Sequence, residues 1–310
     1  MKILVTGGAG KIGGYVLREL LAAGHDLTDF GRSAPLVDGV PHIKGDVADL
    51  TQIREACRGY DAIAHIAAVP GAGIGVSPER LMYVNVLSTF NVLEAAVREG
   101  VGKVVFASSN AAMNLQFDHP DTYPRYLPVD EDHPAEPRNE YGLSKLVNEI
   151  TCKQYSEVYG LRTISLRVNH SWYLDREGAE TAVRSGWNRG RSVTLDQQWA
   201  GYRRFLEGET VGRSNLWAVT DARDTAQAFR LALENTDIVH GTFQVNGFDT
   251  CSTVETATLV ARHYKGVPLR KPLEGYATLV SYDNATRMLG YRPRYTWRES
   301  DFADWLSASA

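Results

Sequence analysis

Short apolar runs alternate with longer segments of helical periodicity through the first half of the chain. The apolar runs predict buried strands at residues 2–6, 25–30, 41–46, 61–68, 103–109 and 162–168. Helical spacing predicts helices at residues 11–23, 51–58, 79–99 and 140–159. Strands and helices that alternate in this way are typical of βαβ units, whose right-handed crossovers build a doubly wound parallel sheet. The expected fold class is therefore α/β, with a Rossmann-type sheet covered by helices on both faces.

The pattern loosens in the second half of the chain. Residues 169–217 are rich in Arg, Gly and Trp and show little periodicity, whereas helices are predicted at 224–234 and 254–263 around a strand at 242–246. We therefore expect a main domain at residues 1–168 and a smaller region at 169–310, some of whose strands and helices return to the main domain. The loop at 118–137 holds five prolines and no periodicity, so we expect it to form a lid or rim.

Composition excludes several classes of function. The formal net charge is −4, and the isoelectric point is about 6.1, so no basic field attracts nucleic acid or an anionic membrane. No apolar run approaches the roughly 20 residues of a membrane span. Cys57, Cys152 and Cys251 are far apart and in no metal-type spacing, which predicts free thiols and no metal site. The start of the chain lacks a signal-peptide core, so we expect a cytoplasmic protein.

A glycine-rich turn follows the first predicted strand. The stretch TGGAGKIGG contains Gly7, Gly10 and Gly13, spaced three apart between a strand and a helix. Glycines in this context permit a tight turn, close approach of the backbone to a pyrophosphate, and close packing of helix on strand. The stretch lacks the Lys-Ser/Thr ending of a nucleoside-triphosphate loop. The turn therefore predicts that residues 1–168 form a dinucleotide-binding domain.

A tyrosine and a lysine lie one helical turn apart in EYGLSK, at residues 140–145. Tyr141 and Lys145 would project from the same face of a helix, close enough for the lysine charge to act on the phenol. Taken alone, this spacing occurs by chance on many helices, as a surface pair. The remaining motifs decide whether Tyr141 and Lys145 are a catalytic pair or a chance surface pair.

The motifs together resemble the extended short-chain dehydrogenases/reductases, which include sugar-nucleotide epimerases and dehydratases and uronate dehydrogenases. TGGAGKIG is similar to the phosphate-binding turn of that superfamily, GDVAD (45–49) to its adenine-contacting segment, and HIAA (65–68) to its fourth-strand motif. Asn85 in YVNVLST resembles the asparagine that supports the active site, FASSN (106–110) contains the catalytic serine, and YGLSK is the Tyr-x-x-x-Lys motif. Later stretches, TDARDTAQAF and MLGYRPRYTW, extend the resemblance over nearly the whole chain.

The resemblance implies a role for each of three residues. Tyr141 would exchange a proton with a substrate hydroxyl or carbonyl while the nicotinamide exchanges a hydride at the same carbon. A free phenol has a pKa of about 10, and the Lys145 charge should lower it. Lys145 would also bind the nicotinamide ribose, and Ser109 would hold and polarise the reacting oxygen.

Further residues complete the expected site. Asn110 and His170 are candidate substrate contacts beside Ser109 and Tyr141, although each could instead make ordinary hydrogen bonds. One of Arg176, Arg184, Arg189 and Arg191 could clamp an anionic group of the substrate, and we expect Trp172, Trp187 and Trp199 to fill a small core. The expected cofactor contacts are Gly7, Gly10, Lys11, Ile12, Gly13, Arg32, Asp46, Val47, Ala67, Asn85, Tyr141 and Lys145.

Two departures from the family pattern refine the expected ligands. Sugar-nucleotide enzymes of the superfamily carry a Tyr/Phe-Gly-Pro-like turn after the sixth strand, whereas this chain reads NHSWYLD, which speaks against a nucleotide-sugar substrate. The second strand ends DFGRS, with Gly31 in the place where NAD users carry an acidic residue and Arg32 beside it. Arg32 could bind a 2′-phosphate or lie against the adenine face. We predict NADP as the preferred cofactor, with NAD possible.

The expected function is that of an NAD(P)-dependent oxidoreductase acting on a secondary alcohol or carbonyl of a sugar or sugar-acid-like molecule. The alternatives are a sugar-nucleotide 4-epimerase or dehydratase with tightly bound NAD, and a non-catalytic redox sensor. The resemblance also implies a homodimer in which the helices beginning near residues 79 and 141 form a four-helix bundle. Leu81, Val84, Leu87 and Val92 are the apolar positions that hint at this interface.

Overall fold

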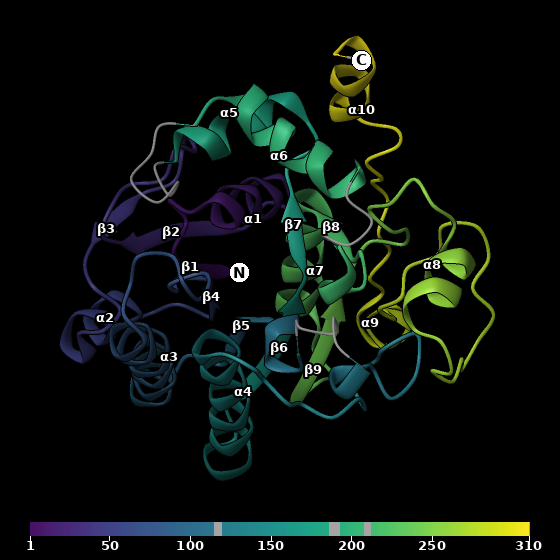
Figure 1. Cartoon of the computed structure of the whole chain (residues 1–310). Helices are drawn as coiled ribbons and strands as arrows, with labels where there is room; N and C mark the ends of the chain where they lie inside the picture. Colours follow the sequence, from purple (N-terminus) through teal and green to yellow (C-terminus); the bar gives the residue numbers. More distant parts are fainter. Residues whose placement is uncertain (115–119, 186–192, 208–211, 310) are drawn as a thin grey trace.

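The main sheet is parallel and doubly wound. The structure is a computed structural model that describes residues 1–114, 120–185, 193–207 and 212–309. Within these residues seven parallel strands form one sheet in the order β3-β2-β1-β4-β5-β6-β9 (Figure 1). The order reverses between β1 and β4, and the carboxyl ends of the strands meet at one edge. The predicted Rossmann-type fold class is therefore confirmed.

The predicted strands and helices of the first half form within a few residues of their expected bounds. The strands of the main sheet are β1 (Lys2–Thr6), β2 (Asp26–Gly31), β3 (His42–Lys44), β4 (Ala62–His65), β5 (Lys103–Ser109), β6 (Arg162–Val168) and β9 (His240–Val245), and β7 (His170–Trp172) pairs with β8 (Val219–Asp221) in a second sheet. The α-helices are α1 (Lys11–Ala22), α2 (Leu50–Ala56), α3 (Pro78–Glu99), α4 (Glu140–Tyr159), α5 (Arg176–Arg184), α6 (Leu195–Glu207), α7 (Ala222–Glu234), α8 (Thr256–His263), α9 (Asp283–Leu289) and α10 (Asp301–Ala308).

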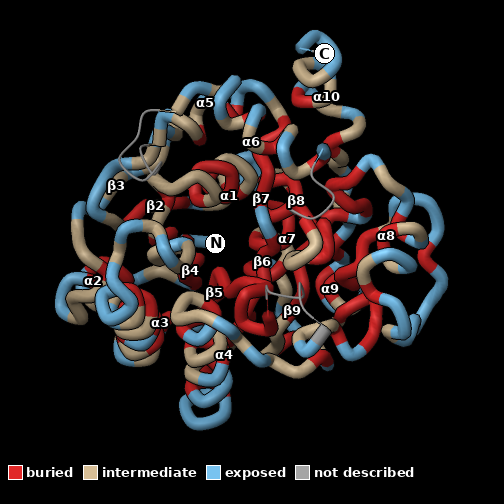
Figure 2. Tube along the Cα trace, in the orientation of Figure 1, coloured by how far each residue is buried: buried red, intermediate tan, exposed pale blue. Residues whose placement is uncertain are grey.

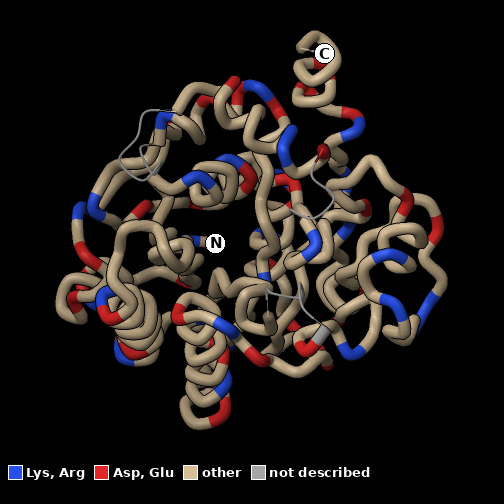
Figure 3. Tube along the Cα trace, viewed as in Figure 1, with Lys and Arg blue, Asp and Glu red and all other residues tan. Residues whose placement is uncertain are grey.

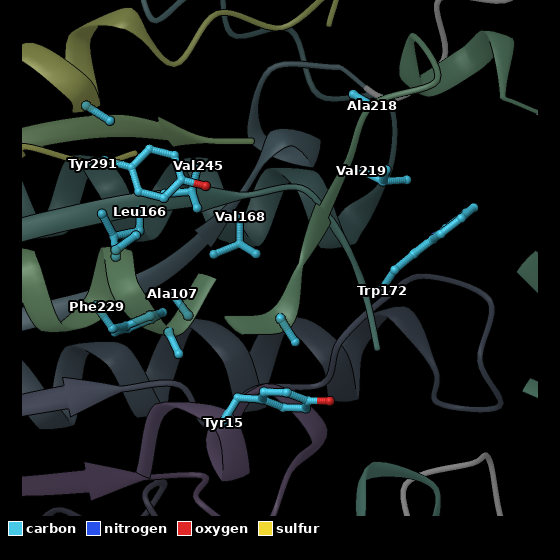
Figure 4. Packing of buried hydrophobic residues seen from close by; sticks show 14 of the residues in the cluster. Tyr15, Ala107, Leu166, Val168, Trp172, Ala218, Val219, Phe229, Val245 and Tyr291 are labelled. Carbon is cyan, nitrogen blue, oxygen red and sulfur yellow. The ribbon is translucent and has the colours of Figure 1, made fainter. Parts of the chain in front are cut away.

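Alternate positions of each strand serve opposite faces of the sheet. Ile3 and Val5 belong to the core under α1 and α7, whereas Leu4 belongs to the core under α2, α3 and α4. The central strands β4 and β5 are buried throughout, whereas the edge strand β3 and the outer turns of the helices are exposed or half-buried (Figure 2). Side chains from both halves of the chain share the first core, among them Leu166 of β6 and Phe229 of α7 (Figure 4).

The two long helices that carry the family motifs are capped at both ends. The Ser77 side chain accepts a hydrogen bond from Arg80 N at the start of α3, and the Asn139 side chain accepts one from Gly142 N at the start of α4. Gly100 and Gly160 end these helices in the left-handed conformation, with φ of 74° and 69°. These residues form a standard polar N-cap and glycine C-cap, which set the bounds of both helices.

The second half returns to the main sheet, as expected. β9 pairs with β6, and α7 packs on α1, so the region at 169–310 supplies an edge strand and a covering helix. The loosened stretch, however, contains the unpredicted helices α5 and α6. Trp199, Tyr202 and Leu206 of α6 are buried at helical spacing among charged residues. Trp172 and Trp199 are fully buried, as expected of core residues, and Trp187 lies outside the described residues.

The proline-rich loop does not behave as a lid in its described part, residues 120–137. Leu127 N donates to Pro268 O at 2.9 Å, and Val129 N donates to Leu279 O at 2.9 Å, so the loop is bonded to the C-terminal region. Leu127 and Val129 are fully buried. These short strand-like bridges to distant segments hold the loop in place although its prolines prevent regular secondary structure. The local sequence could not reveal these contacts. Residues 118 and 119 lie outside the described part.

Charges of both signs are interspersed along the described trace (Figure 3). In the described part of the chain no helix is both long and apolar enough to cross a membrane. The same residues contain no cluster of three His, Cys, Asp or Glu side chains placed to hold a metal ion.

Candidate active site

A deep cleft lies at the carboxyl edge of the sheet, where the strand order reverses. Its volume is about 1020 Å³. Its walls come from the glycine-rich turn, the ends of β2, β4, β5 and β6, and the region after residue 168. Doubly wound sheets bind their ligands at this position.

The glycine-rich turn lines one wall and requires its glycines. Gly7 has φ of 82°, and a Cβ there would lie 2.7 Å from Ala67 N. A Cβ on Gly13 would lie 2.1 Å from Gly7 O, so α1 can approach the turn only without side chains. Gly10, Lys11 and Ile12 place the amino end of α1 at the cleft. This cradle of backbone amides fits the pyrophosphate of a dinucleotide.

The end of β2 and the start of the next loop form one end of the cleft. Gly31, Arg32, Asp46, Val47 and Ala67 all line it, and the last four are among the predicted cofactor contacts. Arg32 is exposed.

Asp29 also reaches this end of the cleft, but both of its carboxylate oxygens are already engaged. Oδ1 accepts a hydrogen bond from Gly8 N at 2.8 Å, and Oδ2 pairs with His42 Nδ1 at 2.7 Å. A Cβ built on Gly31 would lie 4.0 Å from Asp29 Oδ2, so the two positions share a face of β2. Asp29 therefore holds the glycine-rich turn in place and does not substitute for the acidic residue missing at Gly31.

Ser109, Tyr141 and Lys145 come together at the opposite end of the cleft. Ser109 ends β5 and lies beside Tyr141, whose phenolate form it favours. Lys145 Nζ donates to Ala107 O at 2.7 Å and lies 5.6 Å from the centroid of the Tyr141 ring. All three residues line the cleft. The constellation can bind a substrate oxygen between two hydroxyl groups beside a cation.

The charge states of this constellation differ from expectation. Burial raises the pKa of Tyr141, and the effect of the nearby Ser109 side chain only partly opposes it. The pKa of Tyr141 is therefore raised and not lowered as predicted, because burial of the phenol disfavours the phenolate. Burial lowers the pKa of Lys145 to about 7 against an opposing effect of Glu149, so the ammonium is only partly charged at neutral pH.

Asn85 lies behind the cleft wall and holds the segment around Val69 that forms part of it. Its side-chain oxygen accepts from Val69 N at 2.7 Å, and its amide group donates to Val69 O and Ser144 Oγ, both at 3.1 Å. The residue is 1% exposed and does not line the cleft, whereas Val69 does. Any influence of Asn85 on the cofactor therefore passes through the segment that it holds.

Asn110 and His170, the two candidate substrate contacts, both line the cleft. Asn110 is buried, and its side-chain oxygen has no hydrogen-bond partner in the described part of the protein. A buried amide oxygen without a partner is costly, so this atom is suited to a ligand hydroxyl. His170 is exposed in the cleft next to Phe205, where enclosure by the cleft walls and the Lys11 charge lower the pKa of its ring. A neutral imidazole can bind a hydroxyl group.

The expected arginine clamp is not found among the described residues. Arg176 packs over the Trp199 ring, and neither it nor Arg184 lines the cleft. Arg189 and Arg191 lie outside the described residues. The cations that do line the cleft are Lys11, Arg32, Arg80 and Lys145.

Several lining residues escaped the sequence analysis. Gln198 is one of them. Its side-chain oxygen accepts a hydrogen bond from Lys11 Nζ at 3.2 Å, which joins the glycine-rich turn to α6 across the cleft. Other unpredicted lining residues are Arg80, Tyr173, Tyr202, Phe205, Ser214 and Asn215. Most come from the stretch without evident periodicity, and they belong to no motif.

Comparison with known proteins agrees with this geometry. The model of the NAD dependent epimerase/dehydratase family matches residues 3–245. A UDP-glucose 4-epimerase of Corynebacterium glutamicum is 30% identical over 318 aligned positions, which cover 96% of this chain and 92% of the relative. A uronate dehydrogenase of Pseudomonas syringae pv. tomato is 30% identical over 224 positions, which cover 71% of this chain and 74% of the relative.

Solved structures share the fold. The UDP-glucose 4-epimerase of Thermotoga maritima with UDP-glucose superposes with a TM-score of 0.71 at 20% identity, covering 100% of this chain and 99% of the other. A short-chain dehydrogenase/reductase superfamily protein of Agrobacterium tumefaciens with bound NAD gives 0.69 at 24% identity, with coverage of 100% and 97%. With the glycine-rich turn and the Ser, Tyr and Lys constellation in place, the chain belongs to the NAD dependent epimerase/dehydratase family.

Proposed function

We propose that this protein is an NAD(P)-dependent oxidoreductase that transfers a hydride between the nicotinamide and a secondary alcohol or carbonyl carbon of a sugar or sugar-acid-like substrate. The observation that carries the proposal is the meeting of Ser109, Tyr141 and Lys145 at one end of a cleft whose other walls fit a dinucleotide.

The bound nicotinamide would accept or supply the hydride. Tyr141 exchanges the accompanying proton at the substrate oxygen, as base during alcohol oxidation and as acid during carbonyl reduction. The Ser109 hydroxyl donates a hydrogen bond to the same oxygen and so orients it. Lys145 lies beside the Tyr141 ring, where its charge favours the phenolate whenever the ammonium is protonated.

The substrate end of the cleft favours a polyhydroxylated ligand. The unpartnered amide oxygen of Asn110, the neutral ring of His170 and the amide of Asn215 supply hydrogen-bonding groups, and Tyr202 and Phe205 supply apolar surface. β7 occupies the chain directly after β6, where the sequence departs from the sugar-nucleotide pattern. These features support a free sugar or sugar acid as substrate.

We further propose that NADP is the preferred cofactor. Gly31 leaves the end of β2 without the carboxylate that would repel a 2′-phosphate, and Arg32 lies beside it in the cleft. The relatives include an L-arabinose 1-dehydrogenase (NAD(P)(+)) of Haloferax volcanii, which is 32% identical over 178 positions. The name of that relative allows either nucleotide.

A sugar-nucleotide 4-epimerase is the second candidate, because relatives with that name align over nearly the whole chain. The same tyrosine would serve an epimerase, which keeps its cofactor and returns the hydride to the other face of the sugar. An intact catalytic constellation argues against a non-catalytic redox sensor. A reducing, cytoplasmic location is part of the proposal and is supported by the three buried free thiols of Cys57, Cys152 and Cys251.

A substrate panel separates the candidates. Free sugars, uronic acids and nucleotide sugars are each incubated with NAD or NADP while nicotinamide absorbance is followed. An oxidoreductase produces net reduced cofactor with a free sugar or uronic acid. Interconversion of two nucleotide sugars without net absorbance change would establish the epimerase instead, and tight nucleotide binding without turnover of any compound would favour the sensor.

A further inference from the structure

Three residues of α4, spaced four apart, contact three consecutive residues of β5. Tyr141 lies beside Ser109, Lys145 Nζ donates to Ala107 O at 2.7 Å, and Glu149 Oε1 accepts from Ser108 Oγ at 2.5 Å. Because four residues make about one turn, these contacts align one face of α4 with the end of β5. The contact of Glu149 with Ser108 extends this row of α4 residues from Tyr141 and Lys145 into the core.

Glu149 is buried and fully engaged. Arg167 of β6 donates to it through Nε at 3.0 Å and Nη2 at 2.8 Å, a two-pronged ion pair with both side chains no more than 7% exposed. Ser108 and Arg167 are register partners on neighbouring strands, so both approach Glu149 from the same face of the sheet. A buried ion pair is a weak source of net stability, which makes another role worth testing.

We infer that Glu149, held by Arg167 and Ser108, is a positioning residue that keeps the Lys145 ammonium charged and in place beside Tyr141. This inference deepens the proposed function and rests on it for its effect on turnover. The carboxylate is one turn from Lys145 on the same helix, and it raises the pKa of Lys145 against the larger lowering by burial. Without it, a buried lysine would lose its proton at lower pH.

The other charged and titratable groups around this row are accounted for. His65 of β4 is buried between Thr6 and Thr89, and burial and the Lys145 charge keep it neutral by lowering its pKa to about 3. Glu131 accepts from Gln244 N at 2.7 Å and interacts with Arg167, not with Lys145. His240 begins β9 and is bonded to Thr163, near the amino end of β6, at 2.8 Å. Among the described residues Glu149 is thus the anion that acts on Lys145.

The decisive variant is Glu149→Gln, which retains size and hydrogen-bonding groups but removes the charge. Lysine labelled with ¹³C at Cε is titrated by NMR, with the Lys145 resonance identified by its absence in Lys145→Met. We expect its midpoint to fall by about one pH unit or more. Glu149→Asp, which keeps the charge, should restore most of the shift. An unchanged midpoint in Glu149→Gln overturns the inference.

This titration needs neither substrate nor cofactor, so it stands even if the substrate panel finds no turnover. Where turnover is found, kcat/KM of Glu149→Gln relative to wild type should fall as pH rises through 7, reaching about tenfold for a one-unit shift. A loss that is the same at every pH indicates structural damage alone and counts against the inference.

Glu149→Gln leaves the Arg167 cation buried without its partner, which could prevent folding. The double variant Glu149→Gln/Arg167→Met removes both charges and provides the second measurement. Its Lys145 midpoint should also lie below that of wild type, because the Glu149 charge is absent from both variants. A midpoint equal to wild type would contradict the role of Glu149.

Discussion

Tyr141 provides the first test at the scale of single residues. Tyr141→Phe keeps the ring and loses the proton-transferring oxygen, so we expect kcat to fall by at least about 10²-fold with little change in cofactor affinity. Lys145→Ala should weaken both turnover and cofactor binding. Tyr159→Phe, at the exposed end of the same helix, is the matched control and should behave as wild type. Retention of more than about a tenth of the activity by Tyr141→Phe would mean that the role is misassigned.

The raised pKa of Tyr141 gives a direction for the pH dependence. At neutral pH the ligand-free hydroxyl keeps its proton, which suits carbonyl reduction, whereas alcohol oxidation needs the phenolate. We therefore expect the oxidation rate to rise from neutral to alkaline pH as the phenolate forms. Steady-state rates in both directions across this range check the sign, and an oxidation rate that falls steadily from pH 6 upward would contradict it.

Arg32 decides the cofactor prediction. A charge-assisted bond to a 2′-phosphate contributes about 1.5–3 kcal/mol, or about ten- to a hundredfold in affinity. Arg32→Ala should therefore weaken NADP much more than NAD. Gly31→Asp is the reciprocal variant, and space exists for it because the nearest atoms to a Cβ there lie 3.9 Å and 4.0 Å away. It should shift the preference toward NAD.

Calorimetric titration of wild type and both variants with the two nucleotides measures these affinities. Equal affinity of the wild type for NADP and NAD, or tighter NAD binding, would refute this role of Arg32. The catalytic assignment would remain untouched, because Arg32 and Tyr141 lie at opposite ends of the cleft.

At the scale of elements, α3 and α4 expose an apolar face that supports the homodimer prediction. Of the four positions named from the sequence, Leu81 and Val92 are buried, Val84 lines the cleft and Leu87 is half-buried, so they do not form this exposed face, and the homodimer stays a prediction. The exposed apolar residues are instead paired seven apart, with Tyr83 and Phe90 on α3 and Leu143 and Ile150 on α4. α3 and α4 pack side by side (Figure 1), so these pairs form one surface that a second copy could cover.

Charged substitutions on this surface test the homodimer. The protein should sediment at twice its chain mass of 34.3 kDa at micromolar concentration, and Leu143→Glu/Ile150→Glu should sediment as a monomer. Met288→Glu on α9 places the same charge at another exposed apolar residue and should leave the dimer intact. A wild-type protein that is monomeric at these concentrations would exclude the prediction.

At the scale of the whole molecule, Asp224 ties the C-terminal segment to the main domain. Its carboxylate accepts hydrogen bonds from Arg294 N at 3.0 Å and Tyr295 N at 3.1 Å, and the residue is fully buried on α7. Burial raises its pKa from 3.8 to about 7, beyond what these bonds offset. The folded state therefore binds this proton more tightly than the unfolded chain does.

The sign of this linkage predicts a pH-dependent stability. The contribution of Asp224 is fully present below pH 3.8 and is lost as pH rises through about 7. Asp224→Asn cannot ionise, so its free energy of unfolding should decline less than that of wild type between pH 5 and pH 8. Urea unfolding at several pH values measures the difference, with Asp237→Asn in the following exposed loop as control. Parallel curves for wild type and Asp224→Asn would rule out this role.

Local sequence determined most of the first half of the fold. Strands such as β5 and helices such as α3 and α4 were predicted closely because their periodicity and caps depend on neighbouring residues. The roles of the glycines at positions 7 and 13 could also be predicted, since only glycine permits that turn. The motif residues Ser109, Tyr141 and Lys145 could be identified from spacing and resemblance before their contacts were known.

Tertiary structure alone decided the rest, because the relevant contacts join distant segments. The bonds of the 120–137 loop to residues 268 and 279, and the contact of Lys11 with Gln198, have no local signature. The pKa directions of Tyr141 and Lys145 follow from burial, which spacing along a helix does not report. Sequence by itself thus identified the residues proposed to carry the chemistry, and packing determined their partners, the pKa directions of Tyr141 and Lys145 and the shape of the cleft that they share.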